Sequence, residues 1–267
     1  MPGKGKYRKR SRVLPLLLSM MVFIIGCSIY LYPYANGVWM DQLLLRESEE
    51  FLSFVSVMPE TTEQEIPQLE IPETIPFQVE MQPEHYTELW WQMQVYNEDL
   101  FLSGQEGLED EVSYEQPSFV LADYGLENEV FAVLSVPTLD LEMPIYLGAT
   151  KQHMAAGAAH MSQTSLPVGG TNTNCVISGH RGWNGAAYFL NIPNLKKGDI
   201  ITITNLWETL TYQVVEKKII KPYEVESIHI QPGRELVTLL TCHPPATGGR
   251  ERYLVFCERI ETELEVP

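Results

Sequence analysis

The chain has 267 residues, of which 45% are hydrophobic and 20% are charged, so it is long and apolar enough to form a folded core. Its 18 Lys and Arg residues stand against 35 Asp and Glu residues, and a net charge of -17 argues against nucleic-acid binding, which needs basic patches to meet phosphates. The four cysteines are widely spaced, with no Cys-x-x-Cys pair, which excludes a disulfide scaffold and a zinc ribbon; no metal or other cofactor is expected.

A basic cluster followed by an uncharged apolar run opens the chain. Residues 1–12 contain basic but no acidic side chains, and residues 13–40 contain no charged side chain. About 20 apolar residues cross a bilayer core, so residues 13–34 are predicted to form a transmembrane anchor, with the basic tail 1–12 in the cytoplasm. A cleaved signal peptide, or a lipoprotein signal with Cys27 as the lipidated residue, is the alternative, but the length of the run favours an uncleaved anchor.

Three segments follow the predicted anchor. Residues 35–57 mix apolar and acidic side chains and are predicted to form a juxtamembrane helix. Residues 58–83 carry five prolines among Glu, Gln and Thr, which predicts an extended linker rather than the alternative, a recognition tract. Residues 84–128 are predicted to begin with a helix, because apolar side chains recur at helical spacing. Those side chains are Leu89, Met93, Tyr96, Leu100 and Phe101.

Short β-type runs fill residues 129–262, ahead of a short tail at 263–267. β-branched and aromatic residues gather in runs that Gly, Pro and Asn separate. These runs lie at 130–136, 141–146, 175–178, 200–204, 209–220, 236–242 and 253–260. Short helices are expected at 152–159 and 186–190. So many short strands predict a mainly β domain that closes, or nearly closes, into a barrel.

Three residues at the ends of these runs have complementary chemistry. Cys242 ends one apolar run, His180 ends another, and Arg252 begins the last one, so all three can meet at one rim of a barrel. An imidazole can take the proton of a thiol, and a guanidinium can stabilise negative charge that develops on a carbonyl oxygen. The residues alone also allow a second interpretation, in which a buried cysteine is inert and the histidine belongs to the core.

The sequence around these residues resembles the sortases, the cysteine transpeptidases of Gram-positive cell surfaces. Residues 238–242 (TLLTC) match the TLxTC motif of that family. The order and spacing of four further segments resemble class C, the pilin-polymerising sortases. These segments are SLPVGG at 165–170, VISGHRG at 176–182, LKKGD at 195–199 and RYLV at 252–255. The resemblance implies a sortase-type eight-stranded β-barrel with short helices, preceded by N-terminal helices and one transmembrane helix.

The resemblance also implies roles for the three rim residues. Cys242 is similar to the nucleophile of the family, His180 to its acid and base, and Arg252 to the arginine that holds the oxyanion. Arg250 competes for the last role, and Arg252 is preferred because it directly precedes the apolar run of the last strand. No cofactor or metal is implied.

A lid is where this sequence departs from class C. Those enzymes usually carry an Asp-Pro-aromatic motif whose acid binds the arginine and whose ring covers the thiol. Here the corresponding residues are Asp110, Glu111 and Val112. Asp110 can still pair with Arg252, but Val112 is not an aromatic plug, so we expect a lid that is held more weakly than in the family.

The activity that the resemblance implies is acyl transfer outside the cell. A Gram-positive-type enzyme with one membrane span would cleave secreted proteins between Thr and Gly of an LPxTG-like sorting signal, and form a thioester. An amine then resolves the thioester, and in class C that amine belongs to a lysine of a pilin subunit. Three alternatives remain: a housekeeping sortase whose acceptor is a cell-wall amine of peptidoglycan, a thiol hydrolase, and a non-catalytic surface module.

Two further cysteines and two further histidines are expected to be structural. Cys175 and Cys257 fall inside predicted strands as buried thiols, and a disulfide between them stays open. His160 precedes the 165–170 segment and is expected to make a structural hydrogen bond. His243 is adjacent to Cys242 and is expected to pack at the rim.

Overall fold

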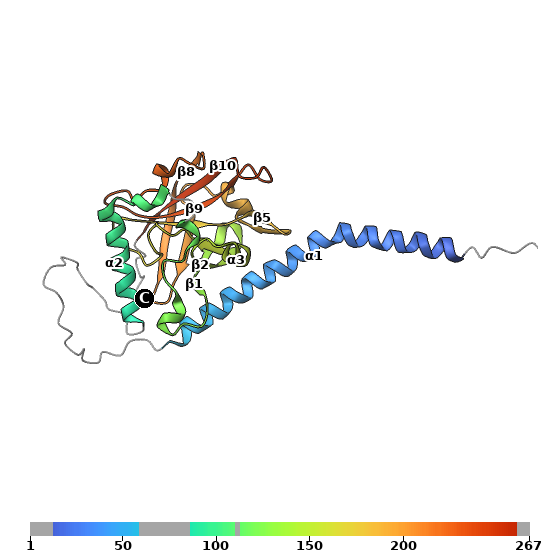
Figure 1. The fold of residues 1–267 in the computed structure, drawn as a ribbon, viewed down its shortest axis with the longest axis horizontal. Helices are drawn as coiled ribbons and strands as arrows, with labels where there is room; N and C mark the ends of the chain where they lie inside the picture. The colour runs from blue at the N-terminus through green and yellow to red at the C-terminus, as the bar shows by residue number, and fades with distance from the viewer. Residues whose placement is uncertain (1–12, 59–85, 110–112, 261–267) are drawn as a thin grey trace, which may run out of the picture.

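The structure is a computed structural model that describes residues 13–58, 86–109 and 113–260. It consists of a long N-terminal helix that leads into a β-rich domain (Figure 1). The predicted cytoplasmic tail, nearly all of the 58–83 linker, the lid residues Asp110 and Val112, and the tail at 263–267 lie outside the described residues.

The N-terminal helix is one continuous element, α1 (Val13–Val57), rather than the two helices predicted from the sequence. Pro33 lies inside it. A single proline removes one backbone donor and bends a helix without necessarily ending it. Of the described residues, one helical stretch, Pro15–Val57, is long and apolar enough to cross a membrane, and its apolar part is not buried in the protein.

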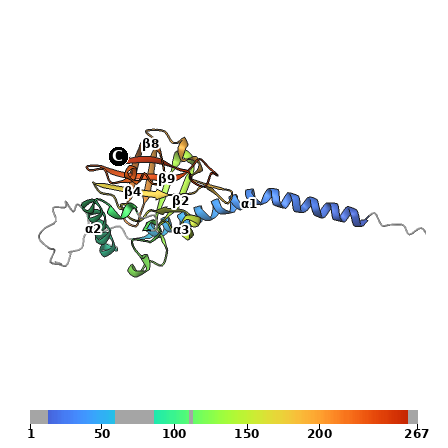
Figure 2. The ribbon, with the colours of Figure 1, turned by 45° about the horizontal axis from the view of Figure 1, so that its top comes forward.

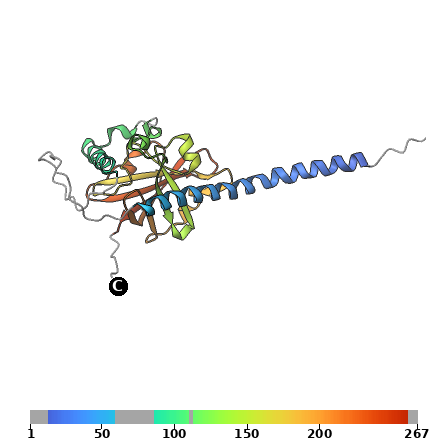
Figure 3. The ribbon, with the colours of Figure 1, turned by 90° about the horizontal axis from the view of Figure 1, so that it is seen from below.

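The second half of α1 packs on the domain and the first half leaves it (Figure 3). Met40, Leu44 and Phe51 are buried in the same hydrophobic core as the barrel strands. The helix α2 (Thr87–Ser103) covers another side of the domain, and Leu89, Met93 and Leu100 of its predicted apolar stripe are buried. Both helices therefore pack on the domain through their apolar faces.

Eight strands form a closed barrel in the order β1-β2-β3-β4-β9-β10-β8-β7, which confirms the predicted fold class. The pairs β2–β3 and β4–β9 are parallel and the other pairs are antiparallel; β4 and β9 run side by side in Figure 2. The barrel strands are β1 (Val130–Val136), β2 (Leu141–Leu147), β3 (Ala158–His160), β4 (Thr173–Ser178), β7 (Ile200–Thr204), β8 (Thr209–Ile220), β9 (Glu235–His243) and β10 (Glu251–Arg259).

Two predicted helices are wrong in whole or in part. The expected helix 152–159 is the shorter α3 (Lys151–Ala156); Gly157 follows it, and the next residues form the barrel strand β3. The expected helix 186–190 is instead the strand β6 (Ala186–Tyr188), paired with β5 (Arg181–Trp183). Asn184 and Gly185 join them with positive φ angles of 49° and 91°, as a tight Asn-Gly hairpin requires.

Short 3₁₀ helices complete the described chain. They are η1 (Glu106–Glu109), η2 (Ser113–Glu115), η3 (Leu121–Tyr124), η4 (Pro137–Leu139), η5 (Phe189–Asn194) and η6 (Val225–Ile228).

The barrel wall carries apolar side chains on both faces around β4, β9 and β10. Alternate residues of these strands point into the barrel, where Ile177, Leu239 and Val255 join the main core. The residues between them point outward and form a second cluster under η1 and η6, which includes Val176 and Leu240. The candidate site lies on this outward face, at the end of β9.

Candidate active site

Cys242, His180 and Arg252 fall on one row across three neighbouring strands. In the antiparallel pair β9–β10, Cys242 lies directly opposite Arg252. In the parallel pair β4–β9, Ser178 lies opposite Leu240, and continuing that register by two residues sets His180 beside Cys242. All three positions share the outward face of the wall with Leu240, because residues two apart on a strand point the same way.

Hydrogen bonds extend the β4–β9 pairing beyond the end of β4. The backbone N–H of Gly179 donates to the carbonyl of Leu240 at 3.0 Å. The hydroxyl of Thr241 donates to the carbonyl of Gly179 at 2.7 Å. These bonds hold Gly179, the residue before His180, against Thr241, the residue before Cys242.

The loop between β9 and β10 brings the thiol and the guanidinium together. A Cβ atom added to Gly249 would lie 3.1 Å from Sγ of Cys242 and 2.8 Å from Nη1 of Arg252, so both groups converge on this glycine. Nη1 of Arg252 donates to the Gly249 carbonyl at 2.7 Å, which fixes the guanidinium beside the sulfur. Arg250 is exposed and precedes β10, so the register favours Arg252.

The imidazole of His180 is half-buried among aromatic rings. It stacks on the indole of Trp183, with centroids 4.4 Å apart and planes 15° apart, and meets the ring of Tyr188 edge-on at 6.0 Å. Loss of water around the ring lowers the pKa of His180. The lowered pKa favours the neutral ring, which is the form that can accept a proton from a thiol.

Arg181 also reaches the site, and the sequence reasoning did not single it out. Its Nη1 donates to the carbonyl of Cys242 at 3.3 Å and meets Nδ1 of His243 at 3.0 Å. His243 itself packs against Tyr253, which confirms its predicted place at the rim. The signal for Arg181 and for Trp183 was their place within three residues after His180, in the strand β5, which was not predicted from the sequence.

A pocket of about 290 Å³ opens beside this row on the outward face. Ser178, Leu240 and Arg252 form its floor from the barrel wall, and Met161, Ile220 and Ile228 are among the apolar side chains around it. Because Arg252 lines it, an extended peptide that lay in this pocket would pass next to the thiol. Mostly apolar walls suit apolar peptide side chains.

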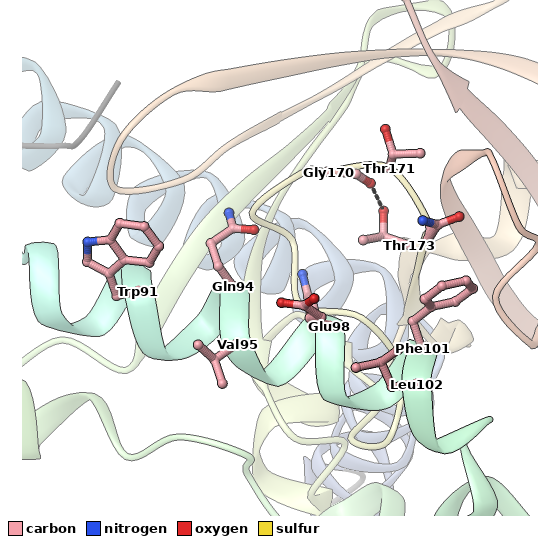
Figure 4. Close-up of a pocket in the computed structure, with 11 residues that line it drawn as sticks. Trp91, Gln94, Val95, Glu98, Phe101, Leu102, Gly170, Thr171 and Thr173 are labelled. Atoms are coloured by element: carbon pink, nitrogen blue, oxygen red, sulfur yellow. Dashed lines mark hydrogen bonds between the residues drawn. The ribbon is translucent and has the colours of Figure 1, made fainter. Parts of the chain in front are cut away.

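A second pocket, of about 200 Å³, lies between α2 and the loop before β4 (Figure 4). Trp91, Gln94 and Glu98 line it from the helix. Gly170 lines it from the loop and Thr173 from the start of β4, and the Thr173 hydroxyl donates to the Gly170 carbonyl. Thr173 begins β4 and His180 follows its end, so this pocket lies at the opposite end of the strand from the row of His180, Cys242 and Arg252.

The three structural residues behave as the sequence predicts. Nε2 of His160 meets the carbonyls of Thr164 and Ser165, both at 3.1 Å, in a fully buried position. Cys175 and Cys257 are free and buried, and burial raises the pKa of each thiol.

The register excludes the disulfide that the sequence left open. Cys175 and Cys257 are both partners of Val237, one on each side of β9. Two strand spacings separate their backbones by about 9 to 10 Å, whereas a disulfide needs Cα atoms within about 7 Å. The two thiols therefore cannot bond without moving the barrel wall.

Comparisons of the sequence with known proteins identify sortases as relatives. The family described as Sortase domain matches residues 134–260. The chain is 28% identical over 135 residues to sortase D of Bacillus subtilis, and 29% identical over 136 residues to sortase A of Streptococcus agalactiae. Each match covers 50% of this chain, and it spans 65% and 54%, respectively, of the length of those curated relatives.

Solved structures of class C sortases match more of the chain. Sortase C-1 of Actinomyces oris is 32% identical with a TM-score of 0.53, and the match covers 65% of this chain and 99% of that one. Sortase C-1 of Streptococcus pneumoniae is 27% identical with a TM-score of 0.62, and the match covers 81% and 99%. A Clostridium perfringens sortase C, solved with its C-terminal cell wall sorting motif, is 27% identical with a TM-score of 0.61, over 82% and 100%. The barrel, the motif segments and these relatives agree: the chain belongs to the sortase family.

Proposed function

We propose that this protein is a membrane-anchored class C sortase, which cleaves an LPxTG-like sorting signal between Thr and Gly and joins it to a lysine amine of a pilin subunit. The observation that carries the proposal is the row of His180, Cys242 and Arg252 beside an apolar pocket on the outward face of the barrel. The class C relatives support the choice of acceptor.

The first half of the reaction forms a thioester. His180 takes the proton of the Cys242 thiol, and the thiolate sulfur attacks the carbonyl carbon of the substrate threonine. The carbonyl oxygen becomes an oxyanion, and the guanidinium of Arg252, already held against Gly249, stabilises it. The bond between Thr and Gly then breaks, and the proton on His180 passes to the departing glycine amine.

The second half returns the enzyme to its starting state. A lysine amine attacks the thioester carbonyl and gives its proton to His180. The C–S bond breaks, an isopeptide bond replaces it, and the Cys242 sulfur recovers its proton from His180. The acidic character of the chain favours an encounter with a cationic lysine.

The anchor gives the enzyme its place in the cell. The apolar part of α1 is exposed and long enough to span a bilayer, and the residues before it are basic. Under the positive-inside rule this supports a barrel outside a Gram-positive-type membrane, on the side where secreted substrates and pilin subunits would be met.

A weakly held lid is part of the proposal. Asp110 and Val112 lie outside the described residues, but Tyr114 and Glu115, a few positions later, line the pocket beside Arg252. A lid in which Asp110 pairs with Arg252 would start at the mouth of that pocket. Residue 112 is a valine, so it does not match the aromatic residue of the family that covers the thiol.

Mass spectrometry of the trapped thioester tests the proposal. The full chain is incubated with sorting peptides and quenched in acid; we expect a mass on Cys242 equal to the peptide up to and including its threonine, and no such mass on Cys242→Ala. Adding a pilin lysine peptide, a cell-wall peptide amine or neither then separates a class C sortase, a housekeeping sortase and a hydrolase. A wild-type enzyme that forms no thioester with any peptide would show a non-catalytic module.

A further inference from the structure

We propose that the β5–β6 hairpin positions His180 by stacking Trp183 on its ring, and that α1 holds this hairpin, so that the membrane anchor helps set the geometry of the active site. The inference rests on the proposed function, since it takes His180 as the acid and base. Trp183 is a positioning residue here, because it acts through the histidine.

The hairpin holds the imidazole from two sides. Trp183 of β5 stacks on one face of the ring at 4.4 Å, and Tyr188 of β6 meets it edge-on at 6.0 Å. The backbone of Phe189 donates to the carbonyl of His180 at 2.9 Å and ties the two ends of the hairpin together. Within the part of the chain that the structure describes, the His180 ring is contacted by aromatic rings and no hydrogen bond to another side chain orients it.

This arrangement supplies what a catalytic base needs. A histidine base is ordinarily oriented by a third group that hydrogen-bonds to its far nitrogen. Here a flat indole fixes the plane of the ring instead. Trp183 remains 41% exposed, so it contributes less to the hydrophobic core than a buried tryptophan would. Its main contact is therefore the stacking on the His180 ring.

The hairpin turn lies directly against α1. Asn36 donates to the carbonyl of Asn184 at 2.6 Å, and Asp41 accepts a hydrogen bond from the backbone of Ala187. Gly37 and Gly185 let the two backbones touch: a Cβ on Gly37 would stand less than 3.0 Å from the Gly185 carbonyl oxygen. Figure 1 shows the β5 end of the domain reaching the middle of α1.

The position of this contact connects it to the membrane. Pro33, whose carbonyl also lies against Gly185, is the second-last residue of the span predicted at 13–34. The hairpin therefore meets α1 where the helix leaves the bilayer. Because the backbones of α1 and the turn touch here, the direction of the helix at that point is passed to the turn, to Trp183 and to His180.

Five variants of the full chain in detergent test the inference. Trp183→Ala removes the stacked ring and Trp183→Phe keeps one. Gly37→Ala adds a methyl where the backbones touch, and Gly26→Ala is its matched control on the same helix, since a Cβ at Gly26 meets nothing within 4 Å. We measure kcat and KM for release of the glycine fragment of a sorting peptide, and the NMR shift of the His180 ring protons, which the indole ring current displaces.

Trp183→Ala is expected to lower kcat by about tenfold or more with KM nearly unchanged, because a displaced catalytic group costs rate rather than substrate binding. Trp183→Phe should recover most of kcat. Gly37→Ala should lower kcat and shift the His180 protons in the same direction, and Gly26→Ala should match the wild type.

Equal kcat values for Trp183→Ala and Trp183→Phe would overturn the stacking role, and equal values for the two glycine variants would overturn the role of the anchor. Trp183→Leu, which keeps apolar volume without a flat ring, separates loss of stacking from loss of folding. If the wild type formed no thioester, the proposed function would fail, yet the ring-current shift would still report whether Trp183 and the anchor set the histidine.

Discussion

His160 is fully buried at the end of β3, and mild acid should therefore weaken the fold through this one side chain. Its Nε2 meets the carbonyls of Thr164 and Ser165, so that nitrogen carries the proton of the neutral ring. Nδ1 is buried and, among the described residues, has no hydrogen-bond partner. Charging the ring would add a proton to Nδ1, where no acceptor receives it.

Burial lowers the pKa of His160 from 6.5 to about 4. The unfolded chain then binds a proton between these pH values while the folded protein does not, so the free energy of unfolding falls as the pH falls below 6.5. At about 1.4 kcal/mol per pH unit, the loss reaches about 3 kcal/mol near pH 4. The ring is wholly out of contact with solvent, so water does not screen this cost.

The variant His160→Gln isolates the effect. Its amide can donate to the same two carbonyls and does not titrate. We would measure urea unfolding of the full chain in detergent by tryptophan fluorescence from pH 7.5 to pH 4.5. Carboxylates with lowered pKa values, such as Glu258, weaken both proteins alike and cancel in the difference. The wild type should lose about 2 to 3 kcal/mol more than the variant over this range. Parallel pH profiles would refute the reasoning.

Three further predictions concern the site and its surroundings. Arg252→Gln should lower kcat/KM by about 100-fold or more through loss of the oxyanion donor, and the exposed Arg250→Gln is its control; equal losses would reopen the choice between them. Cys175 and Cys257 should resist alkylation in the folded protein and show no disulfide by mass spectrometry; a disulfide-linked peptide pair would contradict the strand register. Replacing either cysteine by Ala should lower the free energy of unfolding by about 1 to 2 kcal/mol without loss of kcat. Asp110→Ala should raise the rate of thiol alkylation at the nucleophile by about two- to fivefold, as expected for release of a weak ion pair; an unchanged rate would mean that this residue holds no lid.

The sequence predicted the long strands and the family well, because those signals are local. Each run of β-branched residues, such as 130–136 and 209–220, became a strand with nearly the predicted bounds. The rim positions of Cys242 and Arg252 also followed from local pattern, since prolines and glycines end one strand and an apolar run follows the other.

The local sequence pattern gave wrong predictions for short segments whose structure is decided by the strands they pair with. Ala158, Ala159 and His160 have little preference for a strand, and they become β3 because β2 and β4 flank them. Ala186 and Ala187 favour a helix by composition, but the Asn-Gly turn before them pairs this segment with β5 instead. The sequence contained that turn, and it was the one short-range signal that could have revealed the hairpin.

The amino-acid order by itself determined which residues we propose to carry the chemistry, because the proposed nucleophile, base and arginine lie in segments whose residue types and spacing are fixed along the chain. Only the tertiary structure decided how they meet. Register between strands sets His180, Cys242 and Arg252 on one outward row, and the same register keeps the thiols of Cys175 and Cys257 apart. Register and helix docking depend on contacts between residues far apart in sequence, which is why the contact of α1 with the hairpin beside His180 could not be read from either segment alone.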